Sequence, residues 1–275
     1  MANIPATEVK RLRDATGAGM MAAKRALEEA DGDQDKAAEL LRIKGETKVK
    51  ERGAERTASN GLVAAAEGAM IQLSCETDFV AKSEQFQQLA ADIVSHAHKS
   101  GTSDVASLLT ERLADGRTVA ENIDSVAAII GEKLELSAVV VLGADGGNVA
   151  SYMHRRSSDL PPQVGVLVEF EGDNLDAARG AAMQIAAMKP QFVSRDEVPA
   201  DVVENERRIA EATAREEGKP EQALSKIVEG RVNGFFKEAT LLGQPYALDQ
   251  KKSVQKVLDE AGVTLKRFSR IKVGI

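Results

Sequence analysis

The chain has few of the residues that support base stacking, cross-linking or membrane insertion. Its 275 residues include no tryptophan, one cysteine and an aromatic fraction of only 3%. So few aromatic rings argue against the stacking platforms that bind RNA or single-stranded DNA. The net charge is −7 and there is no basic arm, so we expect no direct nucleic-acid partner. No apolar run approaches the roughly 20 residues that span a bilayer, and we expect no membrane partner.

The single cysteine, Cys75, has no second cysteine with which to form an internal disulfide. No positively charged segment followed by an apolar run begins the sequence, and both observations favour a reducing, cytoplasmic location. Cys75 alternates with Ile71 and Leu73 in a strand-like run. This pattern favours a buried structural thiol over a nucleophile.

No group of residues has the spacing of a known catalytic or metal site. His96 and His98 stand two residues apart on a predicted helix, so they point to different faces and are poorly placed to share a metal ion. The "GAG" at 17–19 lacks the preceding strand and the downstream residues of a phosphate-binding loop. We expect no metal and no cofactor, and favour a binding protein; an enzyme with a pocket in its acidic core is the minority alternative.

The spacing of apolar residues predicts an α+β protein with separate helical parts. Residues 1–45 predict a three-helix partner-binding domain with breaks at "TGAG" (16–19) and "DGD" (31–33), and residues 46–60 a polar linker. Asp33 is placed to cap the third helix and Gly45 to end it. After Gly61 the apolar residues occur in short runs and alternate with other residues, a spacing that is typical of strands.

The rest of the chain predicts a core of two subdomains with small antiparallel sheets. Residues 61–146 form the first, with a hairpin at Glu67-Gly68, helices at 84–99 and about 118–131, and a strand at 133–143. Residues 147–198 and 238–275 form the second, with strands in "NVASYMH", "QVGVLVEFEG" and "VTLKRFSRIKVGI" and a helix from Leu175 to Met188. Between them, residues 199–237 predict a protruding, coiled-coil-like antiparallel helical hairpin with its turn at "EGKP".

Two methionines in the N-terminal helical part could contact a partner. Met20 and Met21 are adjacent, and neighbours on a helix point about 100° apart, so a small domain can bury one while the other lies near its rim. They are either two core residues or an adaptable apolar contact with Arg13 and Lys24 as a polar rim. The pattern alone leaves both readings open.

A phenylalanine at a strand-to-helix corner is the second candidate. Thr77 is a plausible N-cap and Asp78 complements the helix dipole, which places Phe79 in the first helical turn. Core filling is the usual role of a phenylalanine. Because Val80, Phe86 and Leu89 already supply inward positions, Phe79 is well placed to protrude.

Several long segments are similar to one known family. "LRDATGAGMMAAKRALEEADGDQDKAAELLRIKG" resembles the N-terminal domain of bacterial elongation factor Ts, and "CETDFVAK" resembles that family's signature. "IGEKLELSAVV", "SYMH", "GKPEQALSKIVEGR" and "LLGQPYALD" are similar to further family segments in the same order. The resemblance covers essentially the whole chain and implies a ubiquitin-associated-like helical domain, a two-subdomain core and a helical hairpin.

The resemblance also implies a function and a partner. The family members are guanine-nucleotide exchange factors for elongation factor Tu, the GTPase that brings aminoacyl-tRNA to the ribosome. They bind the GDP-bound GTPase, disturb its Mg²⁺ and phosphate-loop site, and are displaced by GTP, without covalent chemistry. The complex would be a heterodimer or a 2:2 assembly. The positions that match family contacts are Arg13, Met20, Met21, Lys24, Asp78, Phe79, Val80, Ile130, Gly131 and His154.

Two features differ from the family pattern. After His154 comes "RRSSDLPPQ", a longer, proline-bearing loop in place of a glycine and an early strand. The sequence stops soon after "RIKVGI", so contacts from a C-terminal helical extension seen in some members are not expected. An adaptor for another helical partner and a self-associating scaffold remain the alternatives to an exchange factor.

Overall fold

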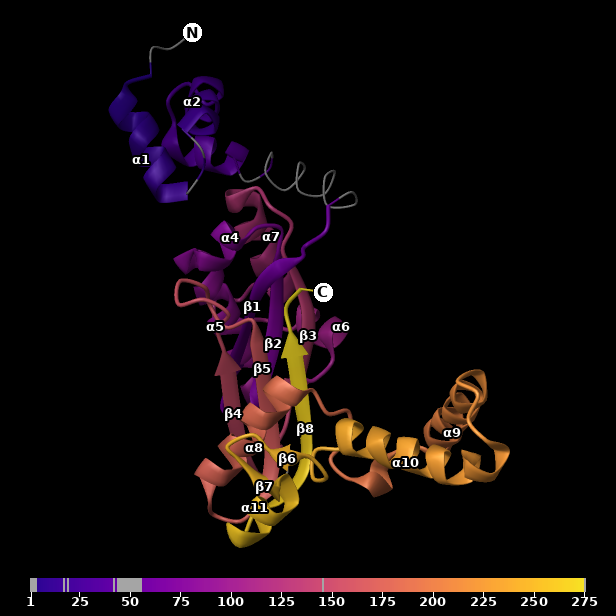
Figure 1. Cartoon of the computed structure of the whole chain (residues 1–275). Coiled ribbons are helices and arrows are strands. Elements are labelled where there is room, and N and C mark those ends of the chain that lie inside the picture. Colours follow the sequence, from indigo (N-terminus) through magenta and orange to yellow (C-terminus); the bar gives the residue numbers. More distant parts are fainter. Residues whose placement is uncertain are drawn as a thin grey trace. The chain divides into compact units, whose positions relative to one another are not determined.

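The computed structural model describes residues 4–16, 18, 20–41, 43, 56–144 and 146–274. Its mixed α+β architecture, with N-terminal helices and small sheets, confirms the predicted fold class (Figure 1). The chain divides into two compact units. The first lies within Met1–Val141, Met153–Val164 and Ile271–Ile275, and the second within Leu142–Tyr152 and Gly165–Arg270.

The N-terminal helices pack around a small apolar core. They are α1 (Ala6–Thr16), α2 (Met20–Glu29) and helical residues 34–41. Asp33 caps the third segment, because its Oδ1 accepts the backbone N–H of Lys36 at 3.1 Å. The predicted helix stop at Gly45 and most of the predicted linker lie outside the described residues. The buried residues of this core are Val9, Leu12, Ala23, Ala26, Leu27, Ala30 and Ala37.

The first sheet has the strand order β1-β2-β3 and is antiparallel. Its strands are β1 (Asn60–Ala66), β2 (Ala69–Cys75) and β3 (Glu135–Val141). Ala66 pairs with Ala69 across the predicted two-residue turn. Gly61 has φ +136°, and a Cβ there would lie 2.2 Å from the Leu73 carbonyl oxygen, so the close pairing of β1 with β2 requires glycine.

Four helices accompany this sheet: α4 (Asp78–Lys82), α5 (Glu84–Ser100), α6 (Val105–Thr110) and α7 (Val119–Ile130). Helix α5 packs on β1 and β2. The side chains of Leu73, Phe86 and Ile93 are fully buried there, so the alternating strand and the helical stripe share one core. The sequence pattern did not reveal α6, whose six residues are too few to establish a period.

The second sheet has the order β4-β5-β8, with strands β4 (Asn148–His154), β5 (Val164–Glu171) and β8 (Thr264–Lys272). Helix α8 (Leu175–Met188) contributes small residues such as Ala178 and Ala182 to a core with Val168 and Phe170 of β5. Three short elements were not predicted: β6 (Pro245–Tyr246), β7 (Asp249–Ser253) and α11 (Val254–Glu260).

Two long helices pair with each other within the second unit. After the short 3-10 helix η1 (Arg195–Glu197), α9 (Ala200–Glu216) and α10 (Glu221–Ala239) pack together, with the break between them at the expected "EGKP". Their shared apolar cluster is Val198, Ala210, Val228, Val232 and Phe236. Among the described residues, none of the helices combines the length and apolar character needed to cross a membrane.

Candidate functional site

The strand-to-helix corner at residues 75–79 is built as the sequence indicates. Strand β2 ends at Cys75, and Thr77 caps α4 by accepting the backbone N–H of Val80 on its Oγ1 at 3.4 Å. Asp78 is the first residue of the helix, where a carboxylate stabilises the exposed N–H groups. The next residue, Phe79, therefore lies in the first helical turn.

The adjacent side chains of Phe79 and Val80 lie in different environments. The side chain of Phe79 is 79% exposed, whereas Val80 is only 8% exposed and belongs to the core under the first sheet. Residues one apart on a helix differ by about 100° in direction, so burying Val80 turns Phe79 outward. Val80 anchors α4 to the core, and its burial does not support the direct partner contact expected of it.

Glu132, which sequence reasoning did not single out, holds this corner. Its Oε2 accepts the backbone N–H groups of Glu76 at 3.1 Å and Thr77 at 3.0 Å. Its Oε1 accepts the hydroxyl of Thr77 at 2.6 Å. In return, Oε1 of Glu76 accepts the backbone N–H of Lys133 at 2.7 Å. Two segments more than 50 residues apart are thus joined by reciprocal charge-assisted hydrogen bonds.

The end of α7 brings Glu132 to the corner. Gly131 adopts φ +83° and closes the helix by donating its N–H to the Ala127 carbonyl at 2.7 Å. This left-handed turn directs the chain back toward β3, with Ile130 half-buried against the core and Gly131 exposed. Both residues were expected contacts, and they lie directly before Glu132.

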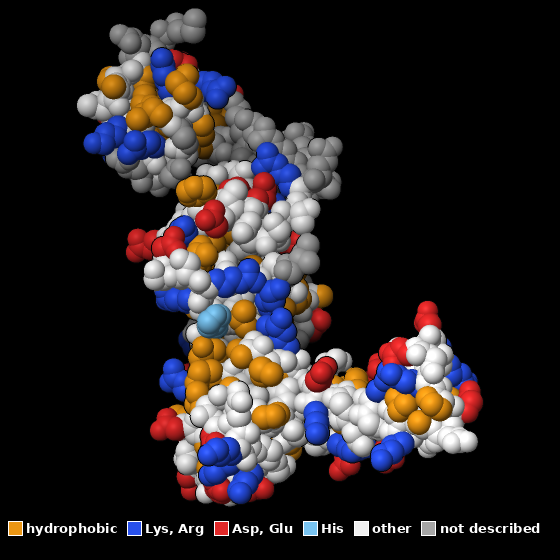
Figure 2. All heavy atoms as spheres, viewed as in Figure 1, with side chains coloured by type: hydrophobic (Ala, Val, Ile, Leu, Met, Phe, Trp, Pro, Cys, Tyr) orange, Lys and Arg blue, Asp and Glu red, His pale blue; other side chains and the backbone are white. Residues whose placement is uncertain are grey.

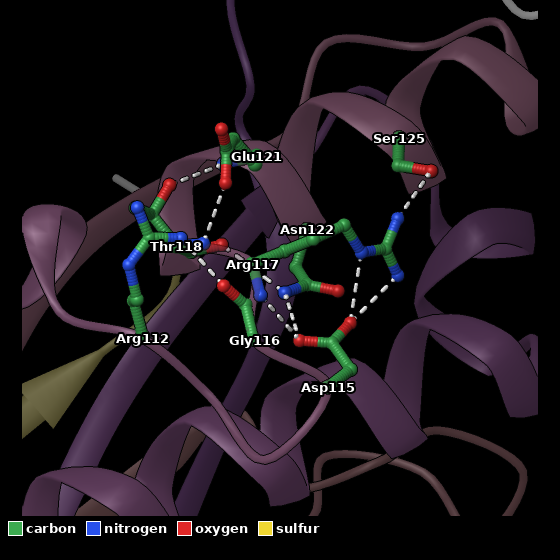
Figure 3. Close-up of polar contacts among 8 residues, drawn as sticks. All are labelled: Arg112, Asp115, Gly116, Arg117, Thr118, Glu121, Asn122 and Ser125. Carbon is green, nitrogen blue, oxygen red and sulfur yellow. Dashed lines mark hydrogen bonds and ion pairs between the residues drawn. The ribbon is translucent and has the colours of Figure 1, made fainter.

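The beginning of α7 is fixed by a polar network (Figure 3). Thr118 and Glu121 form a capping box in which Glu121 Oε2 accepts the Thr118 N–H at 2.7 Å and Thr118 Oγ1 accepts the Glu121 N–H at 3.1 Å. Hydrogen bonding to the Thr118 N–H lowers the pKa of Glu121. Arg117 also donates to Asp115 at 2.8 Å and to Ser125 at 3.2 Å. Helix α7 is therefore anchored at both ends.

Lys82 connects α4 to the loop after His154. Its Nζ lies 2.8 Å from Oδ2 of Asp159, 3.5 Å from Oδ2 of Asp78 and 6.0 Å from the centre of the Phe79 ring. The hydrogen bond from Lys82, with a second from Ser157, lowers the pKa of Asp159 to about 2, and the same contact raises the pKa of Lys82. The loop in which the chain departs from the family pattern is thus attached beside the corner.

The remaining predicted residues are distributed over several elements. Met20 and Met21 are 46% and 64% exposed, so neither is a core residue, and the reading as an exposed apolar surface is the one that fits. Figure 2 shows hydrophobic side chains among charged ones on the visible face of this helical part. Lys24 is exposed and pairs with Glu28 at 3.8 Å, and Arg13 is half-buried.

The histidines and the cysteine have structural partners. His154 is exposed at the end of β4, where its carbonyl accepts the Gln163 N–H at 3.0 Å. His96 lies 2.8 Å from Glu111, and His98 lies 3.1 Å from Glu67. Burial, with a smaller contribution from Glu132, raises the pKa of the Cys75 thiol to about 12. In the described part of the chain, no cluster of side chains has the makeup of a metal site.

The family can be determined from comparison with known proteins. The family model described as Elongation factor TS matches residues 76–275, which include Asp78, Phe79, Glu132 and the helical hairpin. The chain belongs to the elongation factor Ts family. It is 59% identical to elongation factor Ts of Thermobifida fusca over 279 residues, with 100% of this chain and 99% of the relative covered. It is also 60% identical to elongation factor Ts of Nocardia farcinica over 277 residues, with the same coverage.

Family membership fixes the broad role. The elongation factor Ts family consists of nucleotide-exchange factors for elongation factor Tu, which act in translation elongation, and not of catalytic enzymes in the usual sense. The absence of catalytic spacing in the sequence is consistent with that role.

Proposed function

We propose that this chain binds GDP-loaded elongation factor Tu and promotes GDP release by inserting Asp78 and Phe79 into the nucleotide-binding domain. The insertion would displace the elements that hold Mg²⁺ and the phosphate loop. The observation that carries the proposal is the 79% exposure of Phe79 on a corner whose backbone is fixed by Glu132. A large apolar side chain exposed at a rigid, charged corner is suited to enter a pocket of a partner.

The energetics require more than one contact. Burying a phenylalanine side chain contributes about 1.5–3 kcal/mol. Accelerating GDP release about 1,000-fold requires lowering its barrier by about 4 kcal/mol. Phe79 alone therefore falls short, and other contacts must strengthen as the nucleotide site is distorted.

We propose that three further surfaces supply this binding energy. The N-terminal domain, residues 1–45, contributes Met20 and Met21 with Arg13 and Lys24 as a polar rim. The core subdomains, residues 61–146 and 147–198 with 238–275, contribute Ile130, Gly131 and His154. The hairpin, residues 199–237, contacts other domains of the partner. The exposure of both methionines, of Gly131 and of His154 supports these assignments.

Linkage makes the exchange reversible without covalent chemistry. If the exchange factor lowers the affinity of elongation factor Tu for GDP by a given ratio, GDP lowers the affinity for the exchange factor by the same ratio. The same reciprocity holds for GTP. A high concentration of GTP therefore displaces the factor and completes the cycle.

A stopped-flow assay of GDP release tests the proposal. Elongation factor Tu loaded with a fluorescent GDP is mixed with excess unlabelled GDP and increasing amounts of the factor. We expect the wild-type factor to accelerate release and Phe79→Ala to lose most of that acceleration while keeping the fold and much of the affinity. Leu175→Ala, which truncates another exposed apolar side chain, is the matched control.

Each outcome separates the alternatives. Unchanged GDP release with Phe79→Ala would remove the wedge role. Binding of the wild-type factor without any acceleration would indicate an adaptor or scaffold, and a loss of activity with Leu175→Ala equal to that with Phe79→Ala would show a non-specific effect.

A further inference from the structure

We infer that Glu132 is a positioning residue for nucleotide exchange: its carboxylate sets the direction in which α4 presents Phe79. This inference rests on the proposed function, because it concerns the same corner. Glu132 does not itself need to touch the partner. It acts on the Glu76–Thr77 backbone, from which the helix starts.

The arrangement requires an acceptor-only group. Two backbone N–H groups, from Glu76 and Thr77, converge on one oxygen of Glu132 at 3.1 and 3.0 Å. The other oxygen accepts the Thr77 hydroxyl at 2.6 Å. An ionised carboxylate offers acceptors at both oxygens, whereas an amide of the same shape places an NH₂ donor at one of them. Glutamine at this position would either lose the pair of backbone contacts or turn its NH₂ group toward Thr77, whose hydroxyl would then lose the acceptor for its own hydrogen.

The Thr77 hydroxyl transmits the effect to the helix. Because its hydrogen is donated to Glu132, its lone pairs are free to accept the Val80 N–H at 3.4 Å, which is the N-cap bond. Helix α4 has only five residues, so its own hydrogen bonds cannot fix its orientation. The start of the helix, and with it the direction of Phe79, depends on the cap and on the burial of Val80.

The charged side chains next to Glu132 in the structure form their polar contacts with other residues. Glu76 accepts the Lys133 N–H at 2.7 Å through Oε1 and lies 2.8 Å from Arg56 through Oε2. The Lys133 ammonium lies 3.3 Å from Glu135. In the part of the chain that the structure describes, no lysine or arginine forms an ion pair with Glu132, and its carboxylate is satisfied by the N–H and O–H donors of the corner. This is the arrangement of a positioning group and not of a surface ion pair.

Glu132→Gln in the full chain tests the inference, with Glu135→Gln as the matched control on the same segment. Two quantities are measured: the hydrogen exchange of the Glu76 and Thr77 amides by NMR, and GDP release against factor concentration. We expect faster exchange of these two amides, with Leu73 of β2 unchanged. We also expect the saturating release rate to fall about tenfold while the half-saturating concentration changes less than about twofold, since only the oriented state drives release. Glu135→Gln should change neither.

A purely structural role would give a different result. Faster amide exchange with an unchanged saturating release rate would overturn the inference, as would a change in half-saturation alone. If Glu132→Gln does not fold, Thr77→Val and Thr77→Ser are compared instead. Thr77→Val removes the hydroxyl and should lower the saturating release rate. Thr77→Ser keeps the hydroxyl and should leave that rate unchanged. Equal rates for these two variants would also overturn the inference. If the wild-type factor fails to accelerate GDP release, the proposed function fails instead, whatever the amides do.

Discussion

The ammonium group of Lys82 lies 2.8 Å from the carboxylate of Asp159, a residue 77 positions later in the chain. This ion pair ties the loop after His154 to the helix that carries Phe79. The Asp78 carboxylate lies 3.5 Å from the same ammonium group, so two acids share one cation beside the exposed ring. The pair is solvent-exposed and therefore sensitive to pH and salt.

The first prediction concerns the pH dependence of this pair. The pKa of Asp159 is lowered to about 2 in the folded chain, against about 3.9 for an unperturbed aspartate. A lowered folded-state pKa stabilises the fold above the unfolded pKa, and this contribution is lost as the pH falls toward the folded value. Asp159→Asn should therefore lower the urea midpoint slightly at pH 7, and the difference from wild type should shrink as the pH falls from about 4 toward 2.

The control is Asp124→Asn, which removes an exposed carboxylate on α7. Asp124→Asn should leave the urea midpoint nearly unchanged at pH 7. In a second test, high salt should reduce the effect of Asp159→Asn on the urea midpoint. If the urea midpoints of wild type and Asp159→Asn differ as much at low pH as at pH 7, the ion-pair explanation is contradicted.

The second prediction concerns the reactivity of the cysteine. Cys75 is fully buried, its S–H donates to the Thr77 carbonyl at 3.1 Å, and its pKa is raised to about 12. Only the thiolate attacks a disulfide reagent, so the native protein should react with an aromatic disulfide at pH 8 at least about 100-fold more slowly than the urea-unfolded chain. Rapid labelling without denaturant would show that the strand opens locally.

The third prediction concerns the N-terminal helices. The double change Met20→Ala and Met21→Ala should preserve the helical circular dichroism, because alanine favours helices and both side chains are largely exposed. Affinity for elongation factor Tu, measured by calorimetry, should fall about tenfold if these side chains meet the partner. Equal affinity would assign the contact elsewhere.

Leu27 provides the contrasting variant in the same helix. It is fully buried, so Leu27→Ala should destabilise the helical domain by about 2–5 kcal/mol. The two variants thus separate a surface effect from a folding effect.

The fourth prediction concerns the hairpin that leads into the corner. Gly61→Ala should destabilise the first unit strongly, by about 3 kcal/mol, because the new Cβ would meet the Leu73 carbonyl oxygen at 2.2 Å. Gly101→Ala is the control: Gly101 also has a positive φ, +72°, but apart from its chain neighbours nothing lies within 4 Å of its Cβ position. It should cost only the backbone strain of about 1–2 kcal/mol. Urea unfolding of both variants measures the difference, and equal losses would rule out the steric explanation.

Much of the local structure could be predicted from the sequence. The hairpin at Glu67-Gly68, the bounds of α8 and the cap at Thr77 follow from turn chemistry, apolar period and capping preference, which act over a few residues. The short elements α6, β6 and β7 were missed because two to six residues carry too little periodicity. The sequence also left open whether Met20 and Met21 lie in the core, and the structure excludes it because the helices fill their core with Val9, Leu12, Leu27 and alanines.

The sequence by itself determined that residue 79 stands at the start of a helix just after a strand, and that this residue is aromatic and next to an acid. Only the tertiary structure decided that Val80 faces the core and Phe79 faces solvent, and that Glu132 and Asp159 reach the corner from 53 and 80 positions beyond Phe79. Capping is a local interaction and can be recognised in a short window. The approach of distant carboxylates depends on how α7 and the loop after β4 pack, and no local pattern encodes it.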